Sequence, residues 1–482
     1  MVKRTRLGDI NGIDDNKIQT FLGIRYGEPP INERRFKASV ASGGWKNTFE
    51  ATSFPNRAMQ LKLLDADGRK IPGKVSEDCL FMNIYTPKNI SKLVPVLVWM
   101  HGGAFKNGSA NEFDGSVLAE QQQVVVVTLN FRLGAFGFVD FSRFGAEYAG
   151  SASNGVRDAI LALQWIQDNI EEYSGDPSNV TISGESSGGT MVLSLLGCPS
   201  ADPLYQKAIA CSPTCAYRDL EDPTSKIRLA LNINTDDYLS PMLKMSSLDI
   251  CNIELGFGPH VDGEVIKEST FQAIKSRGVN GVPLLIGSNS REGTLYTEGK
   301  DQDQPHYKLW NSGLAREMLC GGNPDPYLAA LKAKYPDASP GKFHELIWTD
   351  MFRRTVTETA RITAEAGIGV WLYRFDKSAN LPQYKNYGAT HAAEMAYMFN
   401  TFDNPKSHAR EFHDRNDKNV RSVARDWSTT IASFMKFGEP SVKGIESWPA
   451  YSGQEENCLI INDDFKVSQH VDSSHQKLWA SG

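Results

Sequence analysis

The most reactive pattern in the chain is a Gly-x-Ser-x-Gly motif at 184–188, with Ser186 at its centre. A β-branched run, Val180–Ser183, precedes the motif, and a small apolar segment, Ser187–Leu196, follows it. A strand, a sharp turn and a helix in this order expose a serine hydroxyl at the turn and direct backbone N–H groups of the helix toward a developing anion. We predict that Ser186 is a nucleophile; the alternative is an ordinary Gly/Ser turn.

A second pattern, His101-Gly-Gly-Ala-Phe105, directly follows the apolar run Val94–Met100. A loop of this type can present the N–H groups of Gly102 and Gly103 to a substrate oxygen, and the N–H of Ser187 would be a third donor. Such donors stabilise a tetrahedral intermediate, and the loss of one costs on the order of 10²–10³ in rate. We expect His101 itself to brace the loop rather than to act as the base.

A serine hydroxyl needs a general base, and the base needs a carboxylate that orients it. Glu292 stands just past the apolar run Val282–Gly287, at the carboxyl end of a strand, where sites form in open α/β sheets. Asp262 is the nearest rival carboxylate upstream. The competing interpretation of Glu292 is a solvated loop residue.

The base is predicted to be His391, which lies in a loop of small residues after the apolar run Val370–Phe375. Besides His101, three histidines precede it without such a loop, and four follow it in charged or C-terminal segments where we expect solvated side chains. The first three are His260, His306 and His344, and the other four are His408, His413, His470 and His475.

The elements that must position these residues alternate between strands and helices. The apolar runs named above, with Gln123–Asn130, have the length and composition of buried parallel strands. Apolar residues at helical spacing between Val156 and Ile170 predict an amphipathic helix, which completes a β-α-β unit. We therefore predict an α/β protein with a mostly parallel central sheet, helices on both faces and inserted cap segments. Residues 1–482 are expected to form a single catalytic domain with insertions at roughly 213–280 and 294–365.

Composition excludes several classes of function. The 51 basic and 57 acidic residues give a net charge of −6, which provides no electrostatic reason for a nucleic-acid partner. No apolar stretch reaches the roughly 20 residues that span a bilayer, and no apolar segment follows the charged N-terminus as in a signal peptide. Seven cysteines, an odd and sparse set, favour a reducing compartment, and the Cys211–Cys215 pair lacks further ligands for a metal site.

Together, these motifs resemble the type-B carboxylesterase (cholinesterase-like) family, and most of all its bacterial para-nitrobenzyl-esterase-type members. The resemblance extends from about Gly12 to Leu459. The segments that carry it are 21–30, 35–36, 76–83, 101–105, 130–134, 154–158, 175–177, 184–189, 259–263, 292–293, 388–391 and 448–451.

Position by position, the resemblance implies an α/β-hydrolase fold with Ser186 as nucleophile, Glu292 as acid and His391 as base. It also implies an oxyanion hole formed by Gly102, Gly103 and Ser187. Ser212 matches a serine that supports the acid–base pair, and the residue beside the nucleophile, Glu185, is expected to hydrogen-bond or to tune the pocket. Buried ion pairs are implied for Arg35 with Glu77 and for Arg132 with Asp158.

This chain departs from the family pattern in three places. Ser187 replaces a more usual alanine, which matters little because its N–H is the working group. Pro213 stands where a glycine is common. The family's disulfide partner for Cys79 is absent near Ala58–Gln60, so we expect Cys79 to be a free thiol in a cytoplasmic protein.

The expected activity is hydrolysis of small to medium, largely apolar carboxylic esters through an acyl-enzyme, without a metal or cofactor. The expected partner is a small-molecule ester, and neither a monomer nor a homodimer is favoured. An amidase, a carbamate hydrolase or a lactonase would use the same residues, and a non-catalytic adhesion or scaffold relative is the alternative of another class. Candidates for an apolar substrate pocket are Phe105, Phe136, Trp310, Trp348, Phe352, Met398 and Phe399. For any single one of them, packing in the core or in a cap segment is the favoured alternative.

The redox state of Cys79 is directly testable. Mass spectrometry of unreduced protein, alkylated after unfolding, should show Cys79 carrying the alkyl group, because the sequence offers it no disulfide partner. Recovery of a peptide cross-linked through Cys79 would contradict the prediction.

Overall fold

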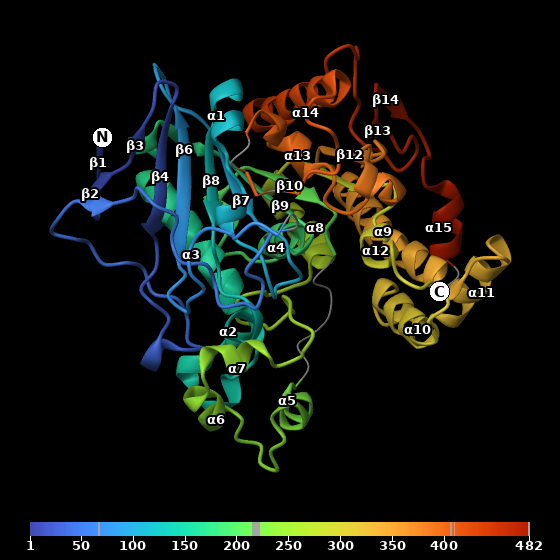
Figure 1. The fold of residues 1–482 in the computed structure, drawn as a ribbon, viewed down its shortest axis with the longest axis horizontal. Coiled ribbons are helices and arrows are strands. Elements are labelled where there is room, and N and C mark those ends of the chain that lie inside the picture. Colours follow the sequence, from blue (N-terminus) through green and yellow to red (C-terminus); the bar gives the residue numbers. More distant parts are fainter. Residues whose placement is uncertain (66–67, 215–221, 405–406, 409, 481–482) are drawn as a thin grey trace. The chain divides into compact units, whose positions relative to one another are not determined.

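The computed structural model describes residues 1–65, 68–214, 222–404, 407–408 and 410–480. Its internal contacts divide the chain into two compact units. Unit 1 comprises Met1–Ile209, Cys215–Asn280 and Asn404–Ala409, and unit 2 comprises Ala210–Thr214, Gly281–Asp403 and Arg410–Gly482. Figure 1 traces the chain through its elements, which run from β1 to α15.

Unit 1 is built on a sheet in which the strands follow the order β9-β7-β8-β6-β4-β3. The three strands β9, β7 and β8 are parallel, whereas β6, β4 and β3 are antiparallel to their neighbours. A small separate sheet contains β1, β2 and β5. The bounds are β1 Val2–Thr5, β2 Gly8–Asn11, β3 Ile13–Asp14, β4 Ile18–Arg25, β5 Phe49–Glu50, β6 Phe81–Pro87, β7 Val94–Met100, β8 Val125–Leu129 and β9 Gly175–Glu185.

The register of the parallel strands positions the two Gly-rich motifs. Met100, at the end of β7, pairs with Gly184 of β9, so the loop that follows β7 and the turn that follows β9 leave the sheet side by side. The buried residues of these strands are mostly β-branched, as expected for strands covered on both faces. The predicted strand Val94–Met100 matches β7 in both bounds.

Helices of unit 1 cover this sheet. Four of them, α5 to α8, lie within the segment of roughly 213–280 that was predicted to be an insertion. The helix predicted between Val156 and Ile170 is α3, and the predicted helix Ser187–Leu196 is α4 with the same bounds. Further along, α5, α6 and α7 pack with α2 into one apolar cluster that includes Phe141 and Tyr238. The bounds are α1 Ser116–Gln122, α2 Gly134–Phe138, α3 Asn154–Asn169, α4 Ser187–Leu196, α5 Thr224–Leu231, α6 Leu239–Lys244, α7 Ser247–Cys251 and α8 Thr270–Arg277.

Unit 2 contains strands in the order β14-β13-β12-β11, of which β11, β12 and β13 are parallel and β14 is antiparallel. The bounds are β11 Leu284–Asn289, β12 Val370–Phe375, β13 Cys458–Ile461 and β14 Phe465–Ser468. Strand β10, Lys207–Cys211, crosses the boundary between the units. Before it, Gln206 N–H donates to Val180 O within unit 1, and after it, Ser212 N–H donates to Gly287 O within unit 2.

The helices of unit 2 lie partly on its strands and partly beyond them. The 26-residue helix α12 packs on β11 and β12, while α10, α11 and α15 join α12 in a second apolar cluster centred on Tyr327 and Ile347. The bounds are α9 Thr294–Thr297, α10 His306–Met318, α11 Asp325–Lys334, α12 Pro340–Glu365, α13 Met395–Met398, α14 Lys418–Phe437 and α15 Ser473–Trp479. None of the helices in the described ranges has both the length and the hydropathy for a membrane crossing.

Two ion pairs implied by the sequence hold loops in unit 1. Arg132 donates to both carboxylate oxygens of Asp158 on α3, at 2.8 and 2.9 Å, and both side chains are buried. Arg35 makes a two-point contact with Glu77. Cys79 is a free thiol, as predicted, and burial raises its pKa well above the usual value.

Removal of the Asp158 charge should destabilise unit 1 strongly. In Asp158→Asn, the buried guanidinium of Arg132 loses its counter-ion, and we expect a loss of about 3–5 kcal/mol in the free energy of unfolding, measured by urea denaturation. The control is Asp168→Asn, which breaks an exposed pair with Arg6 and should cost less than about 1 kcal/mol. Equal effects of the two substitutions would contradict this assignment.

Candidate active site

The predicted site residues fall into two groups, one in each unit. Unit 1 contains Ser186, Ser187 and the glycines Gly102 and Gly103. Unit 2 contains the predicted acid and base and the supporting serine, which are Glu292, His391 and Ser212.

The backbone of Ser186 has the strained geometry expected of an exposed nucleophile. Its φ of 57° and ψ of −124° lie in a region that a residue with a side chain rarely adopts. Ser186 is the N-cap of α4, and its carbonyl accepts the first helical bond from Thr190 N–H at 2.9 Å. The turn predicted from the sequence is therefore present, and the N–H of Ser187 lies in the first turn of the helix.

Close backbone approach explains the glycines around Ser186. A Cβ on Gly188 would lie 2.0 Å from Met100 O, so only glycine allows α4 to pass against the end of β7. A Cβ on Gly102 would lie 2.7 Å from Glu185 Oε2 and 3.1 Å from Ser186 Cβ. The Gly102 backbone is therefore in close contact with the turn at Ser186.

The loop after β7 is held by its own hydrogen bonds and by Gln60. Asn107 N–H donates to Gly103 O at 2.9 Å. Gln60 accepts from Gly108 N–H at 3.0 Å and donates to Gly108 O at 2.8 Å, so one buried amide side chain pins the end of the loop. A preorganised loop of this kind keeps its N–H groups in place without reorganisation during a reaction.

His101 braces this loop, as predicted, and is unsuited to act as a base near neutral pH. Its ring is buried and stacks on Phe131 with ring centroids 4.6 Å apart. Burial lowers the pKa of the imidazole to about 4, so the ring is neutral at pH 7.

In unit 2, the predicted acid and base are in direct contact. His391 Nδ1 lies 2.6 Å from Glu292 Oε2, and the carboxylate is completely buried. A carboxylate in this position fixes the orientation of the imidazole and places its proton on Nδ1. The alternative of a solvated loop residue is therefore wrong for Glu292. The rival Asp262 accepts backbone N–H groups from Glu264, Val265 and Ile266 and stabilises a turn in unit 1.

The other oxygen of Glu292 is held by two neighbours. Ser212 Oγ donates to Oε1 at 2.5 Å, which agrees with the supporting role that the family resemblance implies. Asn289 N–H also donates to Oε1, at 2.6 Å. These donors satisfy the buried carboxylate and prevent it from rotating away from His391.

Two short contacts tie the loop of Glu292 to the loop of His391. Arg291 N–H donates to Ala389 O at 2.9 Å, and the hydroxyls of Thr294 and Thr390 lie 2.8 Å apart. The two loops, about a hundred residues apart in the sequence, are thereby fixed to each other within unit 2.

Aromatic rings enclose the imidazole of His391. Phe352 of α12 stacks on it with centroids 4.6 Å apart, and Tyr296 of α9 is tilted against it at 5.9 Å. Trp348 stacks on Tyr296 at 4.2 Å, which extends the ring cluster along α12. The imidazole of His391 is therefore held by aromatic rings on one side and by a carboxylate on the other.

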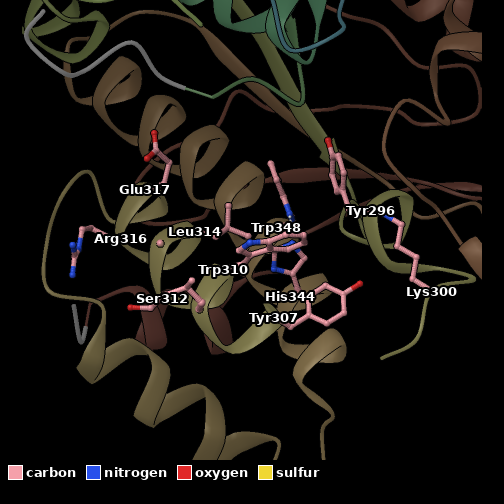
Figure 2. Close-up of a pocket in the computed structure, with 12 residues that line it drawn as sticks. Tyr296, Lys300, Tyr307, Trp310, Ser312, Leu314, Arg316, Glu317, His344 and Trp348 are labelled. Carbon is pink, nitrogen blue, oxygen red and sulfur yellow. Dashed lines mark hydrogen bonds between the residues drawn. The ribbon is translucent and has the colours of Figure 1, made fainter. Parts of the chain in front are cut away.

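The remaining pocket candidates lie in different surroundings. Phe105 is buried against Phe138 in unit 1, and Phe136 joins the apolar cluster around Phe36. Met398 and Phe399 are completely buried at α13. Trp310 of α10 is 52% exposed and lines a cavity with Trp348 (Figure 2).

Two residues that the sequence analysis missed support the acid. Asn289 contacts Glu292 through its backbone and donates its side-chain amide to Glu394 Oε2 at 2.7 Å. Glu394 is completely buried and stands three residues after His391. In the sequence, only its position three residues after His391 sets Glu394 apart. That spacing does not predict a contact with Asn289, because the contact depends on how β11 and the His391 loop are placed in the fold. Glu185, which was predicted, is buried with Oε2 close to Gly102.

The expectation that four later histidines are solvated is wrong for most of them. His413 is completely buried against Tyr397, and burial and the nearby charge of Lys377 lower its pKa to about 4. His408 contacts Asp65 and His475 contacts Asp350, at 2.8 and 2.7 Å. Of the four, only His470 is exposed. The prediction failed for the others because charged neighbours in the sequence do not determine which way a side chain points.

Comparison with known proteins places the chain in a family. The model of the Carboxylesterase family matches residues 1–479. The para-nitrobenzyl esterase of Bacillus subtilis (strain 168) is 33% identical over 497 aligned residues, which cover 99% of this chain and 98% of the relative. Carboxylesterase 5A of Canis lupus familiaris is 31% identical over 99% of this chain and 88% of the relative.

Solved structures agree with this result. A PNB esterase superposes with a TM-score of 0.87 at 30% identity, and 99% of each chain is covered. A carboxylesterase of Geobacillus stearothermophilus superposes with a TM-score of 0.84 at 28% identity over 99% of each chain. The chain belongs to the carboxylesterase family and has the α/β-hydrolase fold. It is a carboxylic ester hydrolase.

The Ser212 contact can be tested separately from folding. Ser212→Ala removes a charge-assisted hydrogen bond to Glu292, and we expect kcat on p-nitrophenyl butyrate to fall about tenfold or more, since such bonds are worth about 1.5–3 kcal/mol. The matched control is Ser433→Ala, another buried serine of unit 2, which should leave kcat unchanged. A normal kcat in Ser212→Ala with unchanged thermal stability would show that the contact does not position the base.

Proposed function

We propose that the protein is a serine carboxylesterase in which Ser186, His391 and Glu292 form a catalytic triad. The observation that carries the proposal is the buried contact between His391 Nδ1 and Glu292 Oε2, together with the strained turn at Ser186. We further propose that the two compact units act as one catalytic domain, with the nucleophile and oxyanion hole supplied by unit 1 and the base and acid by unit 2.

In this mechanism, His391 Nε2 accepts the proton of the Ser186 hydroxyl as its oxygen attacks the ester carbonyl carbon. The carbonyl electron pair moves to the oxygen, where N–H groups of Gly102, Gly103 and Ser187 stabilise the negative charge. Collapse of the intermediate breaks the bond to the alcohol, which leaves with the proton from His391.

Water then attacks the acyl-enzyme, with His391 again accepting a proton, and the carboxylic acid is released as Ser186 regains its proton. Glu292 remains ionised throughout and stabilises the imidazolium form of His391. Residues of the chain and water account for every proton and electron pair, so the proposed mechanism needs no metal or cofactor.

The proposed substrates are small to medium, largely apolar esters. Phe105, Trp310, Phe352, Met398 and Phe399 are the proposed sources of apolar contact, and the stacking of Phe352 on His391 supports this choice for Phe352. Apolar contacts discriminate between chain lengths by only about 1–3 kcal/mol per methylene, so we expect a broad substrate range.

We also propose that the protein acts in the cytoplasm. The six described cysteines are free, and the four buried ones have a raised pKa or are sheltered from solvent, as in proteins of a reducing compartment. The alkylation experiment on Cys79 tests this proposal as well, since a disulfide there would oppose it.

The decisive experiment replaces the nucleophile. Wild-type protein should hydrolyse p-nitrophenyl acetate and butyrate, and Ser186→Ala should lower kcat by on the order of 10⁴ or more, because no hydroxyl remains to form the acyl-enzyme. The control is Ser187→Ala, which keeps the backbone N–H and should retain most of the activity. An unchanged rate in Ser186→Ala would remove the assignment.

A matched panel extends this experiment to the substrate class. Aryl esters, amides and carbamates with the same leaving group are compared in wild type and Ser186→Ala. We expect the Ser186-dependent rate to be highest for esters. A higher rate for the amides or carbamates would transfer the proposal to an amidase or a carbamate hydrolase with the same triad.

A further inference from the structure

The loop that follows β7 turns back on itself, so that its far end packs against its Gly-rich start. Gly108 has a φ of +106°, and a Cβ built on it would lie 2.3 Å from Gly102 O and 2.4 Å from His101 Nδ1. Both distances are too short for a side chain, so only glycine allows this approach. The position of Gly108 therefore limits where the carbonyl group of Gly102 can lie.

That carbonyl group determines the direction of a neighbouring N–H group. The peptide unit between Gly102 and Gly103 is planar and trans, so the carbonyl of the first residue and the N–H of the second point in opposite directions. His101 Nδ1 lies 2.9 Å from Gly102 O, and a carbonyl oxygen can only accept, so the imidazole donates from Nδ1. The contacts of Gly102 O with His101 and Gly108 thus fix the direction of the Gly103 N–H.

A single side chain, the amide of Gln60, holds Gly108 in place. The amide accepts from Gly108 N–H at 3.0 Å and donates to Gly108 O at 2.8 Å, and it also donates to Ala58 O at 3.1 Å. Its oxygen and both of its N–H groups are therefore engaged with backbone. Gln60 is only 2% exposed, so solvent water has little access to these bonds and does not replace them.

The segment that carries Gln60 is fixed independently of the loop after β7. The backbone of the buried Arg57 donates to Lys74 O at 2.7 Å and accepts from Ser76 N–H at 2.9 Å. The Arg57 guanidinium donates to Lys62 O at 3.1 Å, two residues beyond Gln60. Because the chain is anchored on both sides of Gln60, its amide has a fixed position from which it can hold the loop.

We propose that Gln60 is a positioning residue that holds Gly108 and thereby aims the N–H of Gly103 at the oxyanion. This inference rests on the proposed function, because it concerns the same acyl-transfer site. The chain of contacts lies within unit 1 and ends at one rigid peptide unit, so Gln60 acts through the loop and contacts no reacting atom. An oxyanion forms only along the path of reaction, so a misdirected donor lowers kcat and leaves the binding of the ester unchanged.

The test replaces Gln60 by methionine, which has a similar volume but offers Gly108 no hydrogen bond. With p-nitrophenyl butyrate, Gln60→Met should lower kcat about tenfold or more and change KM by less than about twofold, since complete loss of an oxyanion donor costs on the order of 10²–10³ in rate. The matched control is Gln167→Met on α3, where the amide also donates to two backbone carbonyls. This control should keep kcat within about twofold of wild type, because Gln167 does not contact the loop after β7.

A trifluoromethyl ketone provides a readout that a general loss of stability would not change. With butyl trifluoromethyl ketone, the oxygen of Ser186 bonds to the carbonyl carbon, its proton passes to His391, and the carbonyl electron pair becomes an oxyanion. The inhibition constant of this ketone should rise in Gln60→Met by the same factor as kcat falls. The acidic limb of the pH profile of kcat should not move, because the contact between His391 and Glu292 is unaltered.

Gln60→Asn decides the case in which Gln60→Met fails to fold, as judged by circular dichroism and thermal melting. Its amide is one methylene shorter and reaches Gly108 less well, so kcat and ketone affinity should both fall, by a smaller factor than in Gln60→Met.

Three outcomes would overturn the inference: a normal kcat in the folded Gln60 variants, an equal fall in kcat in Gln167→Met, or a fall in kcat without a matching loss of ketone affinity. Failure of the proposed function has a different signature, which is an unchanged rate in Ser186→Ala. The two failures are therefore distinguishable.

Discussion

A carboxylate without contact to solvent must be surrounded by hydrogen-bond donors, and the surroundings of Glu292 are organised by this requirement. Ser212 and the backbone of Asn289 hold one oxygen, which leaves the other directed at His391 Nδ1 at 2.6 Å. The donors come from the ends of β10 and β11, and the histidine comes from the loop after β12. The adjacency of β12, β11 and β10 in the sheet is thus what makes an oriented imidazole possible.

A second constraint, of steric origin, governs unit 1. The end of β7 and the start of α4 approach so closely that a side chain on Gly188 would collide with Met100 O. This crowding also holds Ser186 at a positive φ, because the chain must leave β9 and enter α4 within one residue. Strain of this kind persists only where the surrounding strands and helix over-determine the backbone.

The rings of unit 2 connect the base to a part of the molecule that the catalytic mechanism does not use. Phe352 and Tyr296 contact His391, Trp348 contacts both of these rings, and His344 fixes Trp348. Closely packed rings with satisfied polar groups are stiff, so the position of the imidazole depends on α12 as well as on Glu292. An open cavity lies beside these rings, between α10 and α12.

By itself, the sequence was sufficient to identify β7, β12 and α4 with their bounds and to place Ser186, Gly102 and Glu292 at the ends of strands. Short-range patterns succeed there because strand composition and glycine spacing are local properties. Only the tertiary structure showed that Asn289 and Glu394 adjoin the acid, that His413 is buried, and that α10 and α12 enclose a cavity. These features depend on contacts between residues tens to hundreds of positions apart, and neither the direction of a side chain nor the space between two helices is encoded in a local pattern.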